Sequence, residues 1–528
     1  MFKYFINHIK KYRLLIFLFL ITSIIFDIIE IIIPYILSNF IDNITIYKNT
    51  KLILNSSLIL FMLIIFQCLF NYLKEILYTK SAQQIRYAML DNSISHIEKS
   101  QIKDINTFNP AYLNQRLNDD ILNIINFMLT NVCNSIIKII TLVSLSIIVI
   151  NINFKIFIVI VLSVTVNSFG FFFYNKLLYK TGYDYREANN NFYAAHNDRL
   201  SMIKQTKINS WFEVVKLKCI DFFNILLSKS ANYAKTSAKL NNIGYLSTGL
   251  SLILIIILGG NELLMGNLTI GQLILTYNYA NICINCSKSF LSITQSYQHA
   301  AVCYNRMSEI LNLKLEINGS KRLNSIDSIE IKNLSFQYNS SKKLYENLNY
   351  KFTKGHIYCV KGDNGSGKST LLDIILGLRY DYDGQILYNG LDLKNLDSNF
   401  LRKNLISVVE QEPKLINVSL KENLVYGLEN YSDSTLFDFC NYFDLNDVLN
   451  STESKLSGGE KQKIAIIRSF LKLPQLIVLD EPISALDSES IKKLKNTLTY
   501  EKNNKIIILI THNEELDSII DEVIELEN

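Results

Sequence analysis

Charged residues are scarce in this chain. Asp, Glu, Lys and Arg make up 19% of its 528 residues, whereas apolar residues make up 49%. A water-soluble protein of this length rarely has so little charge, so the composition favours a part embedded in a membrane. The net charge of +5 is small for such a chain and gives no reason to expect a nucleic-acid partner. The length corresponds to roughly two to four domains.

The chain also lacks a cysteine framework. Its eight cysteines are scattered, which excludes the paired spacing of a disulfide-stabilised domain. Cys283 and Cys286 have the spacing of a metal or redox pair, but they lie in an apolar, helix-like run with no second pair and no nearby His. We therefore interpret them as ordinary helix residues rather than as ligands.

Six apolar runs precede residue 310, and each has the roughly 20 residues that a helix needs to cross the hydrocarbon core. They are residues 14–37, 52–72, 133–152, 154–174, 243–264 and 270–290. The first run follows basic residues and lacks a small-residue cleavage site, so we expect an uncleaved span. The two long connections, 73–132 and 175–242, have a helical pattern, and we expect the spans to continue through them.

Basic residues indicate the orientation of these spans. Lys and Arg are frequent before the first run and in both long connections, whereas residues 261–269 contain none. By the positive-inside rule we expect the N-terminus and both long connections to be cytoplasmic. An even number of spans then returns the second half of the chain to the cytoplasm.

Two acidic residues interrupt the first apolar run. Asp27 and Glu30 are three positions apart and therefore share one helix face. Carboxylates are costly inside a membrane, so they require an explanation. They either pair with a neighbouring helix, for which Lys138 is a candidate, or face a central cavity and favour a cationic substrate. Lys138 can also extend its ammonium group to the membrane interface.

A phosphate-binding motif opens the second half. Residues 362–369 have the P-loop spacing, after a β-type run at 357–360 and before an apolar helix at 371–378. Its glycines allow peptide N–H groups to surround phosphates, Lys368 adds a charge on the β- and γ-phosphates, and the Ser369 hydroxyl can ligate Mg²⁺. The residues expected to hold the nucleotide here are Gly362, Asn364, Gly365, Gly367, Lys368, Ser369 and Thr370.

Two carboxylates follow a second buried strand. The apolar run 476–479 ends at Asp480, which places this carboxylate at the carboxyl edge of a parallel sheet. Asp480 can hold Mg²⁺ through water. Glu481 is suited to orient or deprotonate an attacking water.

Three single residues complete the expected site. Gln411 follows a short strand, and its amide can reach the metal or the water. His512 ends another strand, where it can contact the γ-phosphate. Tyr338 precedes the P-loop and can stack on adenine. We therefore predict Glu481, His512 and Gln411 as catalytic residues, and Ser369, Gln411 and Asp480 as metal ligands.

A second anion site lies about 90 residues after the P-loop. Ser457, Gly458 and Gly459 precede a helix-forming run, and such a helix N-terminus with a bare backbone favours an anion.

The order of these motifs resembles that of ATP-binding cassette ATPases. Tyr338, GDNGSGKST, Gln411, LSGGE, LIVLDEP, SALD and His512 occur in the order of that family. The six apolar runs ahead of them resemble the half-transporter form of ATP-binding cassette exporters, as do IIIPYILSNFID, FNPAYLNQRLNDDI, GNLTIGQLI and AAVCYNRMSEILN. We therefore predict an α-helical membrane domain with six transmembrane helices at 1–310, a linker at 311–327, and an α/β P-loop ATPase domain at 328–528.

The resemblance implies ATP-driven export by a dimer in the cell membrane, with ATP and Mg²⁺ bound by a cytoplasmic ATPase domain. It implies that Ser457, Gly458 and Gly459 contact the γ-phosphate on the P-loop of a second half-transporter, and that Asp487 ends the SALD motif at the nucleotide. Coupling helices are expected near 108–120 and 196–211. Since no catalytic group is missing, we expect a homodimer. Its apolar runs should be surrounded by membrane lipid, and we expect no nucleic-acid partner.

The chain departs from the family pattern in several places. Only 45 residues separate Gln411 from Ser457, so this segment is shorter than the helical subdomain usual in the family. NSTESK replaces the acidic, Gly-containing segment common before the signature, and Glu460 stands where Gln is more frequent. The chain ends 16 residues after His512, so we expect it to lack the family's usual closing tail, and we expect no peptidase domain before the first span. As substrate we expect a peptide or bacteriocin, with a multidrug or lipid exporter as the alternative and a membrane-bound regulatory ATPase without transport as a remote one.

Overall fold

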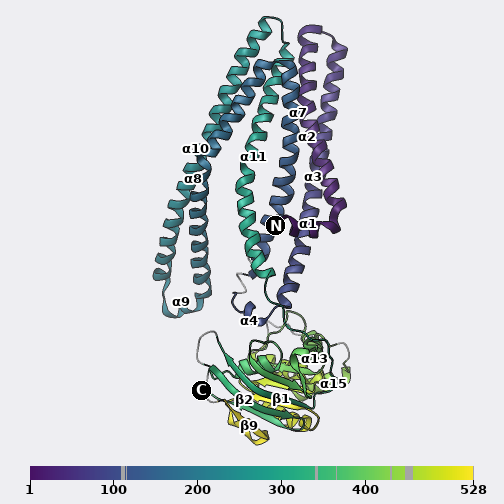
Figure 1. Ribbon diagram of the computed structural model, residues 1–528, viewed down its shortest axis with the longest axis vertical. Coiled ribbons are helices and arrows are strands. Elements are labelled where there is room, and N and C mark those ends of the chain that lie inside the picture. Colours follow the sequence, from purple (N-terminus) through teal and green to yellow (C-terminus); the bar gives the residue numbers. More distant parts are fainter. Residues whose placement is uncertain are drawn as a thin grey trace. The chain divides into compact units, whose positions relative to one another are not determined.

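The structure is a computed structural model of the chain (Figure 1) and describes residues 1–108, 113–114, 116–338, 343–363, 365–428, 431–445 and 456–526. The chain divides into two units. We call Met1–Ser95 with Asn109–Asn312 the helical unit, and His96–Phe108 with Leu313–Asn528 the sheet unit.

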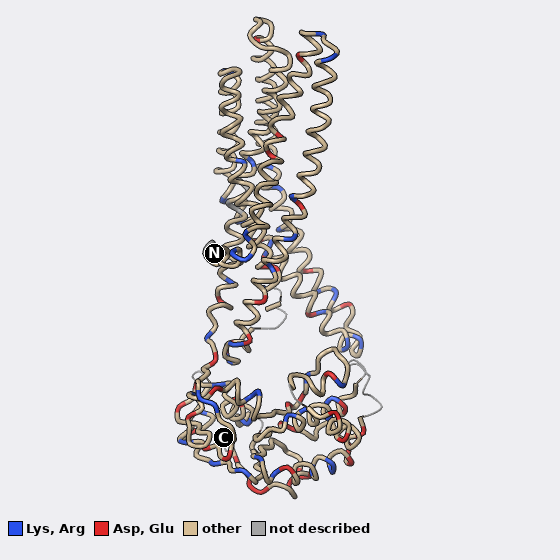
Figure 2. The backbone as a smooth tube through the Cα atoms, turned by 90° about the vertical axis from the view of Figure 1, so that its right-hand side faces the viewer, with Lys and Arg blue, Asp and Glu red and all other residues tan. Residues whose placement is uncertain are grey.

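Long helices form the helical unit. Figure 2 shows that these helices carry few charged residues over much of their length, as the scarcity of charge in the sequence requires. The helical segments are α1 (Phe2–Ile9), η1 (Lys10–Tyr12), α2 (Arg13–Asp42), η2 (Asn43–Tyr47), α3 (Thr50–Glu98), η3 (Arg116–Asp120), α6 (Ile121–Asn126), η4 (Phe127–Val132), α7 (Cys133–Ile152), α8 (Phe154–Ser201), α9 (Ile203–Asn209), α10 (Phe212–Leu264) and α11 (Ile270–Leu311).

Five segments of the described chain are long and apolar enough to cross a membrane: Tyr4–Tyr47, Thr50–Glu98, Arg116–Ile152, Phe154–Ser201 and Phe212–Leu264. They contain the first five predicted spans. The sixth predicted span, 270–290, lies in α11, a 42-residue helix that is not among the five. Asn278, Asn281 and Asn285 lower the hydropathy of α11, while Tyr279 and Cys283 are buried in the core of the unit.

Within the described residues the two long connections are mostly helical, as expected. The helices α8 and α10 lie side by side, and α9 joins their ends (Figure 1). Gly170 allows this close approach, because a side chain there would lie 2.9 Å from a methyl group of Ile243. Asn167 adds a hydrogen bond of 3.1 Å to Ser247 Oγ. The segment 196–211, expected to contain a coupling helix, spans the end of α8 and all of α9.

The sheet unit contains two sheets and short helices. A five-stranded sheet has the order β6-β7-β8-β3-β9 and is parallel, and a four-stranded antiparallel sheet has the order β2-β1-β4-β5. The strands are β1 (Ser328–Gln337), β2 (Lys343–Thr353), β3 (Ile357–Lys361), β4 (Asp383–Tyr388), β5 (Leu391–Asp392), β6 (Ile406–Val409), β7 (Leu476–Asp480), β8 (Ile506–Ile510) and β9 (Glu522–Glu525). The helical segments are α4 (Ile102–Ile105), α12 (Lys368–Ile375), η5 (Leu393–Asn395), α13 (Ser398–Asn404), α14 (Leu420–Val425), α15 (Asp433–Tyr442), α16 (Gly458–Leu471), α17 (Ser488–Glu501), η8 (Lys502–Asn504) and η9 (Glu514–Ile519).

The strand register aligns the carboxyl ends of the parallel strands. Ile510 pairs with both Asp480 and Val360, and Leu479 pairs with Val409. The chain segments that follow β3, β6, β7 and β8 therefore leave the sheet at one edge, where ligands bind in open parallel sheets.

The α-helical and α/β parts follow one another as predicted. The helix after the P-loop begins at Lys368, after its N-cap Gly367, and ends at Ile375, shortly before Gly377 with a φ angle of 66°. Both ends therefore lie earlier than the predicted 371–378.

Candidate nucleotide-binding site

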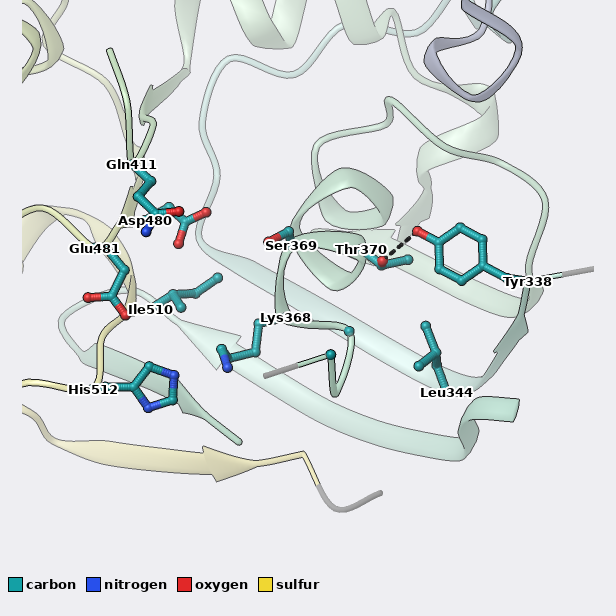
Figure 3. A pocket seen from close by; sticks show the side chains of 12 residues that line it. Tyr338, Leu344, Lys368, Ser369, Thr370, Gln411, Asp480, Glu481, Ile510 and His512 are labelled. Carbon is teal, nitrogen blue, oxygen red and sulfur yellow. Dashed lines mark hydrogen bonds between the residues drawn. The ribbon is translucent and has the colours of Figure 1, made fainter. Parts of the chain in front are cut away.

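A cavity of about 380 Å³ lies at the carboxyl edge of the parallel sheet (Figure 3). Its walls combine the P-loop, β2 and the segments after β6, β7 and β8, so the fold brings together residues that are far apart in sequence. The lining residues are Tyr338, Leu344, Gly365, Gly367, Lys368, Ser369, Thr370, Gln411, Asp480, Glu481, Ile510 and His512.

The P-loop requires glycine at particular positions. Gly365 and Gly367 have φ angles of 89° and 98°, in the region that side chains disfavour. A Cβ atom on Gly367 would also lie 2.5 Å from the hydroxyl of Tyr345. This hydroxyl donates a hydrogen bond to the Gly367 carbonyl and so supports the loop from β2. Asn364 lies outside the described residues.

Lys368 lies at the start of α12, with its ammonium group inside the loop. Its Nζ atom donates hydrogen bonds to the carbonyl oxygens of Gly362 at 2.6 Å and Asp363 at 3.1 Å. The free N–H groups of a helix N-terminus and this ammonium group together form a site for phosphate oxygens.

Acidic residues form one side of the cavity. Figure 3 shows Gln411, Asp480 and Glu481 on one side, with Tyr338 on the opposite side. Burial and then the charge of Glu481 raise the pKa of Asp480 above its ordinary value, although Lys368 opposes this shift. A divalent cation would relieve this repulsion between neighbouring carboxylates.

The oxygen donors in the cavity fit Mg²⁺. Ser369, Gln411 and Asp480 contribute a hydroxyl, an amide and a carboxylate, which are the ligand types this hard cation prefers. Among the described residues, those of the cavity included, no cluster of three or more His, Cys, Asp or Glu side chains is arranged to hold a metal.

Tyr338, the residue predicted to stack on adenine, lines the cavity beside the P-loop. Its hydroxyl is 2.8 Å from Thr370 Oγ1, directly after the P-loop serine, and its ring is partly exposed (Figure 3). The hydrogen bond between these two hydroxyls therefore links the ring of Tyr338 to the segment directly after the P-loop.

The signature residues lie elsewhere in the sheet unit. Ser457 is the N-cap of α16 in a capping box with Glu460, and neither Gly458, Gly459 nor Asp487 lines the described cavity. A side chain on Gly459 would lie 2.7 Å from the Ala485 carbonyl oxygen, so α16 packs against the SALD segment.

Asp487 itself precedes α17. Its Oδ1 atom accepts a hydrogen bond from Ser490 and lies 3.4 Å from Lys463 Nζ of α16. The hydrogen bond from Ser490 holds the pKa of Asp487 below its ordinary value.

Sequence reasoning missed several contributors. Leu344 and Ile510 line the cavity with apolar surface, Tyr345 supports the P-loop, and Arg379 contacts Tyr338. Arg379 directly follows the apolar run 371–378, and a charge at that place was the signal available in the sequence. The predicted segment 450–455 before the signature lies outside the described residues, as do 109–112 and 115 of the expected first coupling segment. The structure has a helical turn just before that segment, at α4.

Two family models match this chain. The model described as ABC transporter transmembrane region matches residues 16–286, which is more than half of the chain, and the model described as ABC transporter matches residues 345–484. The two matches fall on the long helices and on the segment that contains the P-loop and Asp480.

Curated relatives show moderate identity. A protein of Rickettsia bellii, whose name describes an export ATP-binding/permease protein, is 30% identical over 312 residues, which are 55% of this chain and 54% of the relative. The multidrug resistance-like ATP-binding protein MdlA of Buchnera aphidicola is 28% identical over 378 residues, 67% of this chain and 64% of the relative. The chain spans about half the length of the curated relatives it matches first.

The fold is also found in a solved structure. A bacterial Atm1-family ABC exporter with ATP bound superposes with a TM-score of 0.81 at 17% identity, covering 99% of this chain and 94% of that one. The chain therefore belongs to the ABC transporter family, with a multi-pass transmembrane region followed by an ATPase domain, which is the domain order of an exporter half-transporter.

Proposed function

We propose that this protein is an ATP-driven exporter in which two chains pair and hydrolyse ATP to move a substrate across the membrane. The observation that carries this proposal is the cavity of Figure 3, in which Lys368, Glu481 and His512 surround one space. Transfer of a phosphoryl group to water requires charges held in place, with no covalent enzyme intermediate.

Each lining residue has a distinct role in this proposal. Lys368 binds the β- and γ-phosphates, Glu481 orients or deprotonates the attacking water, and His512 contacts the γ-phosphate. When bound, Mg²⁺ neutralises charge on the phosphate oxygens. Ser369, Asp480 and Gln411 are the residues that would hold it.

The signature residues support a dimer. Since Ser457 does not line the cavity of its own chain, we assign it, with Gly458 and Gly459, to the γ-phosphate on the P-loop of a second chain. Asp487 would lie near the same contact. Every predicted catalytic residue is present in this sequence, which favours a homodimer with two working sites.

The remaining assignments concern location and substrate. We place the protein in the cell membrane, and the distribution of Lys and Arg favours a cytoplasmic N-terminus and ATPase domain. We propose a peptide or bacteriocin as substrate. The names of the relatives, which mention export and multidrug resistance, support export and leave a drug or lipid substrate as the alternative.

Reconstitution in liposomes tests the proposal. We expect Mg²⁺-dependent ATP hydrolysis that Lys368→Ala abolishes, and ATP-dependent movement of a peptide, drug or lipid probe. Absence of hydrolysis by the intact chain would overturn the proposal. Hydrolysis with no transport of any of the three probe classes would favour a regulatory ATPase instead.

A further inference from the structure

Polar side chains of the sheet unit form a continuous chain from α4 to the cavity. Lys103 Nζ of α4 lies 2.8 Å from Asp381 Oδ2, and Arg379 Nε donates to Asp381 Oδ1 at 2.8 Å. Arg379 Nη1 donates to the hydroxyl of Tyr338 at 2.8 Å. All four residues belong to the same unit.

Arg379 packs against two aromatic rings that also contact each other. Its guanidinium carbon lies 4.6 Å from the ring centre of Tyr338 and 4.8 Å from that of Phe336. Its side chain is only 8% exposed. A buried guanidinium needs a hydrogen-bonded counter-charge, and Asp381 supplies one with an Nε–Oδ1 ion pair.

Asp381 joins two cations. Burial alone would raise its pKa, but hydrogen bonds from Lys103 and Arg379 outweigh burial and hold the pKa below its ordinary value. The carboxylate is therefore charged at neutral pH and attracts both partners.

The backbone just before α4 is anchored to the rest of the sheet unit, which brings Lys103 within reach of Asp381. The peptide N–H of Gln101 donates to the Lys314 carbonyl at 2.8 Å, and that of Glu316 donates to the Lys99 carbonyl at 2.8 Å. The turn thus lies beside residues 314–316. It also directly follows α3, which carries the second predicted span.

We propose that Arg379 is a positioning residue for the nucleotide base, and that Asp381 and Lys103 link the position of α4 to the orientation of Tyr338. This inference rests on the proposed function, because it requires a nucleotide base at Tyr338. The Tyr338 hydroxyl is shared between Arg379 and Thr370, so movement of Arg379 turns the ring relative to the P-loop. Nucleotide binding and α4 would then influence each other reciprocally.

Two ligands separate positioning of the base from binding of the phosphates. The full-length protein in lipid nanodiscs is titrated by calorimetry with MgATP and with magnesium tripolyphosphate, which has no base. We expect Arg379→Gln to weaken MgATP binding about tenfold, since a stacking contact and a hydrogen bond that orient Tyr338 are lost. Tripolyphosphate binding should change less than about twofold, because the P-loop is intact.

Matched variants guard against a general effect on folding. Arg379→Lys keeps the charge and should lose part of the MgATP affinity, because an ammonium group cannot stack and bond simultaneously. Arg322 is a control with similar contacts outside the cavity, since it stacks on Phe400 at 4.8 Å and pairs with Asp397 at 3.1 Å. Arg322→Gln should leave both affinities unchanged. Equal losses for both ligands in Arg379→Gln, or no loss, would overturn the positioning role.

The link to α4 is tested by a double-mutant cycle. Lys103→Ala should weaken MgATP binding about threefold and add little to Arg379→Gln, because either change interrupts the same chain of contacts. Strictly additive losses, or no effect of Lys103→Ala, would disprove the link. Failure of the unaltered protein to bind MgATP would instead overturn the proposed function itself.

Discussion

The peptide N–H of Glu481 donates a 2.9 Å hydrogen bond to the carbonyl oxygen of Ile510. This bond holds Glu481 with a φ angle of 46°, a left-handed conformation that is costly for a residue with a side chain. Because Asp480 is paired with Ile510 in the adjacent strand, the strained residue lies directly at the sheet edge. Such strain is retained where neighbouring structure enforces it, typically at functional sites.

Glu481→Gln should trap bound ATP. The amide keeps the size of the side chain but cannot accept a proton, so turnover should fall about 100- to 10,000-fold while MgATP still binds. Phosphate release and nucleotide retained after gel filtration measure the two effects. Glu330→Gln, on a β1 surface pair with Lys332, is the matched control and should hydrolyse ATP normally. A normal rate for Glu481→Gln would assign the base elsewhere.

Mixed dimers should recover activity if the signature acts on the second chain. Ser457→Arg and Lys368→Ala should each be inactive alone. In a 1:1 mixture, half of the dimers combine an intact P-loop with an intact signature at one site, so roughly a quarter of the activity should return. When the mixed dimers are isolated through two different tags, each has one intact site of two, so about half of the activity should return. Inactive mixed dimers would show that the two motifs do not form a composite site.

Glu460→Gln should strengthen ATP binding at the signature. The Ser457 N–H and hydroxyl hold the pKa of Glu460 below its ordinary value, so a carboxylate lies at the expected γ-phosphate contact. Glutamine preserves the capping box and removes the charge, so KM for ATP should fall about threefold, the size of a surface charge interaction.

Glu422 provides a matched control for that substitution. It forms the same capping box with Ser419 at the start of α14 and lines no part of the described cavity. Glu422→Gln should leave KM unchanged. An unchanged or higher KM in Glu460→Gln would contradict the repulsion argument.

Metal affinity should depend on pH through Asp480. Its raised pKa means that protons compete with Mg²⁺ at a higher pH than for an ordinary Asp, so affinity falls as the pH drops toward that pKa. The stability of the metal-free protein depends on pH in the opposite direction. Because the folded chain binds the proton on Asp480 more tightly than the unfolded chain does, this group stabilises the fold as the pH falls. Binding of Mn²⁺ with ATP, followed by electron paramagnetic resonance, should show a lower midpoint pH in Glu481→Gln. Identical midpoints would exclude coupling between the two carboxylates.

The acidic pair in α2 can be tested by substrate charge. Lys138 Nζ lies 3.4 Å from Asp27 Oδ1 and 3.3 Å from Glu30 Oε2, so one ammonium group serves two carboxylates. The surplus negative charge favours a cation, although the contacts also fit helix pairing. Asp27→Asn with Glu30→Gln should reduce ethidium-stimulated ATP hydrolysis several-fold and spare the basal rate. Unchanged transport of every substrate would leave the pair with a helix-packing role alone.

Local chemistry explains which expectations were confirmed. The P-loop, β7 and the long helices depend on residues adjacent in sequence, such as Gly367 beside Lys368, so their patterns were readable directly. The sixth span was harder to identify, because α11 combines buried apolar residues with several asparagines. Its hydropathy is too low to indicate a membrane span from composition alone, although it forms the expected long helix.

The sequence by itself determined the two-part architecture and the residue types of the nucleotide site, because hydrophobic period and motif spacing are local properties of the chain. Only the tertiary structure decided which residues share the cavity and that Lys103 reaches Asp381 across 278 positions. It also placed Arg379 against Tyr338 and kept Ser457 out of the cavity of its own chain. These relationships depend on strand register and on side-chain packing between distant segments, which no local pattern encodes.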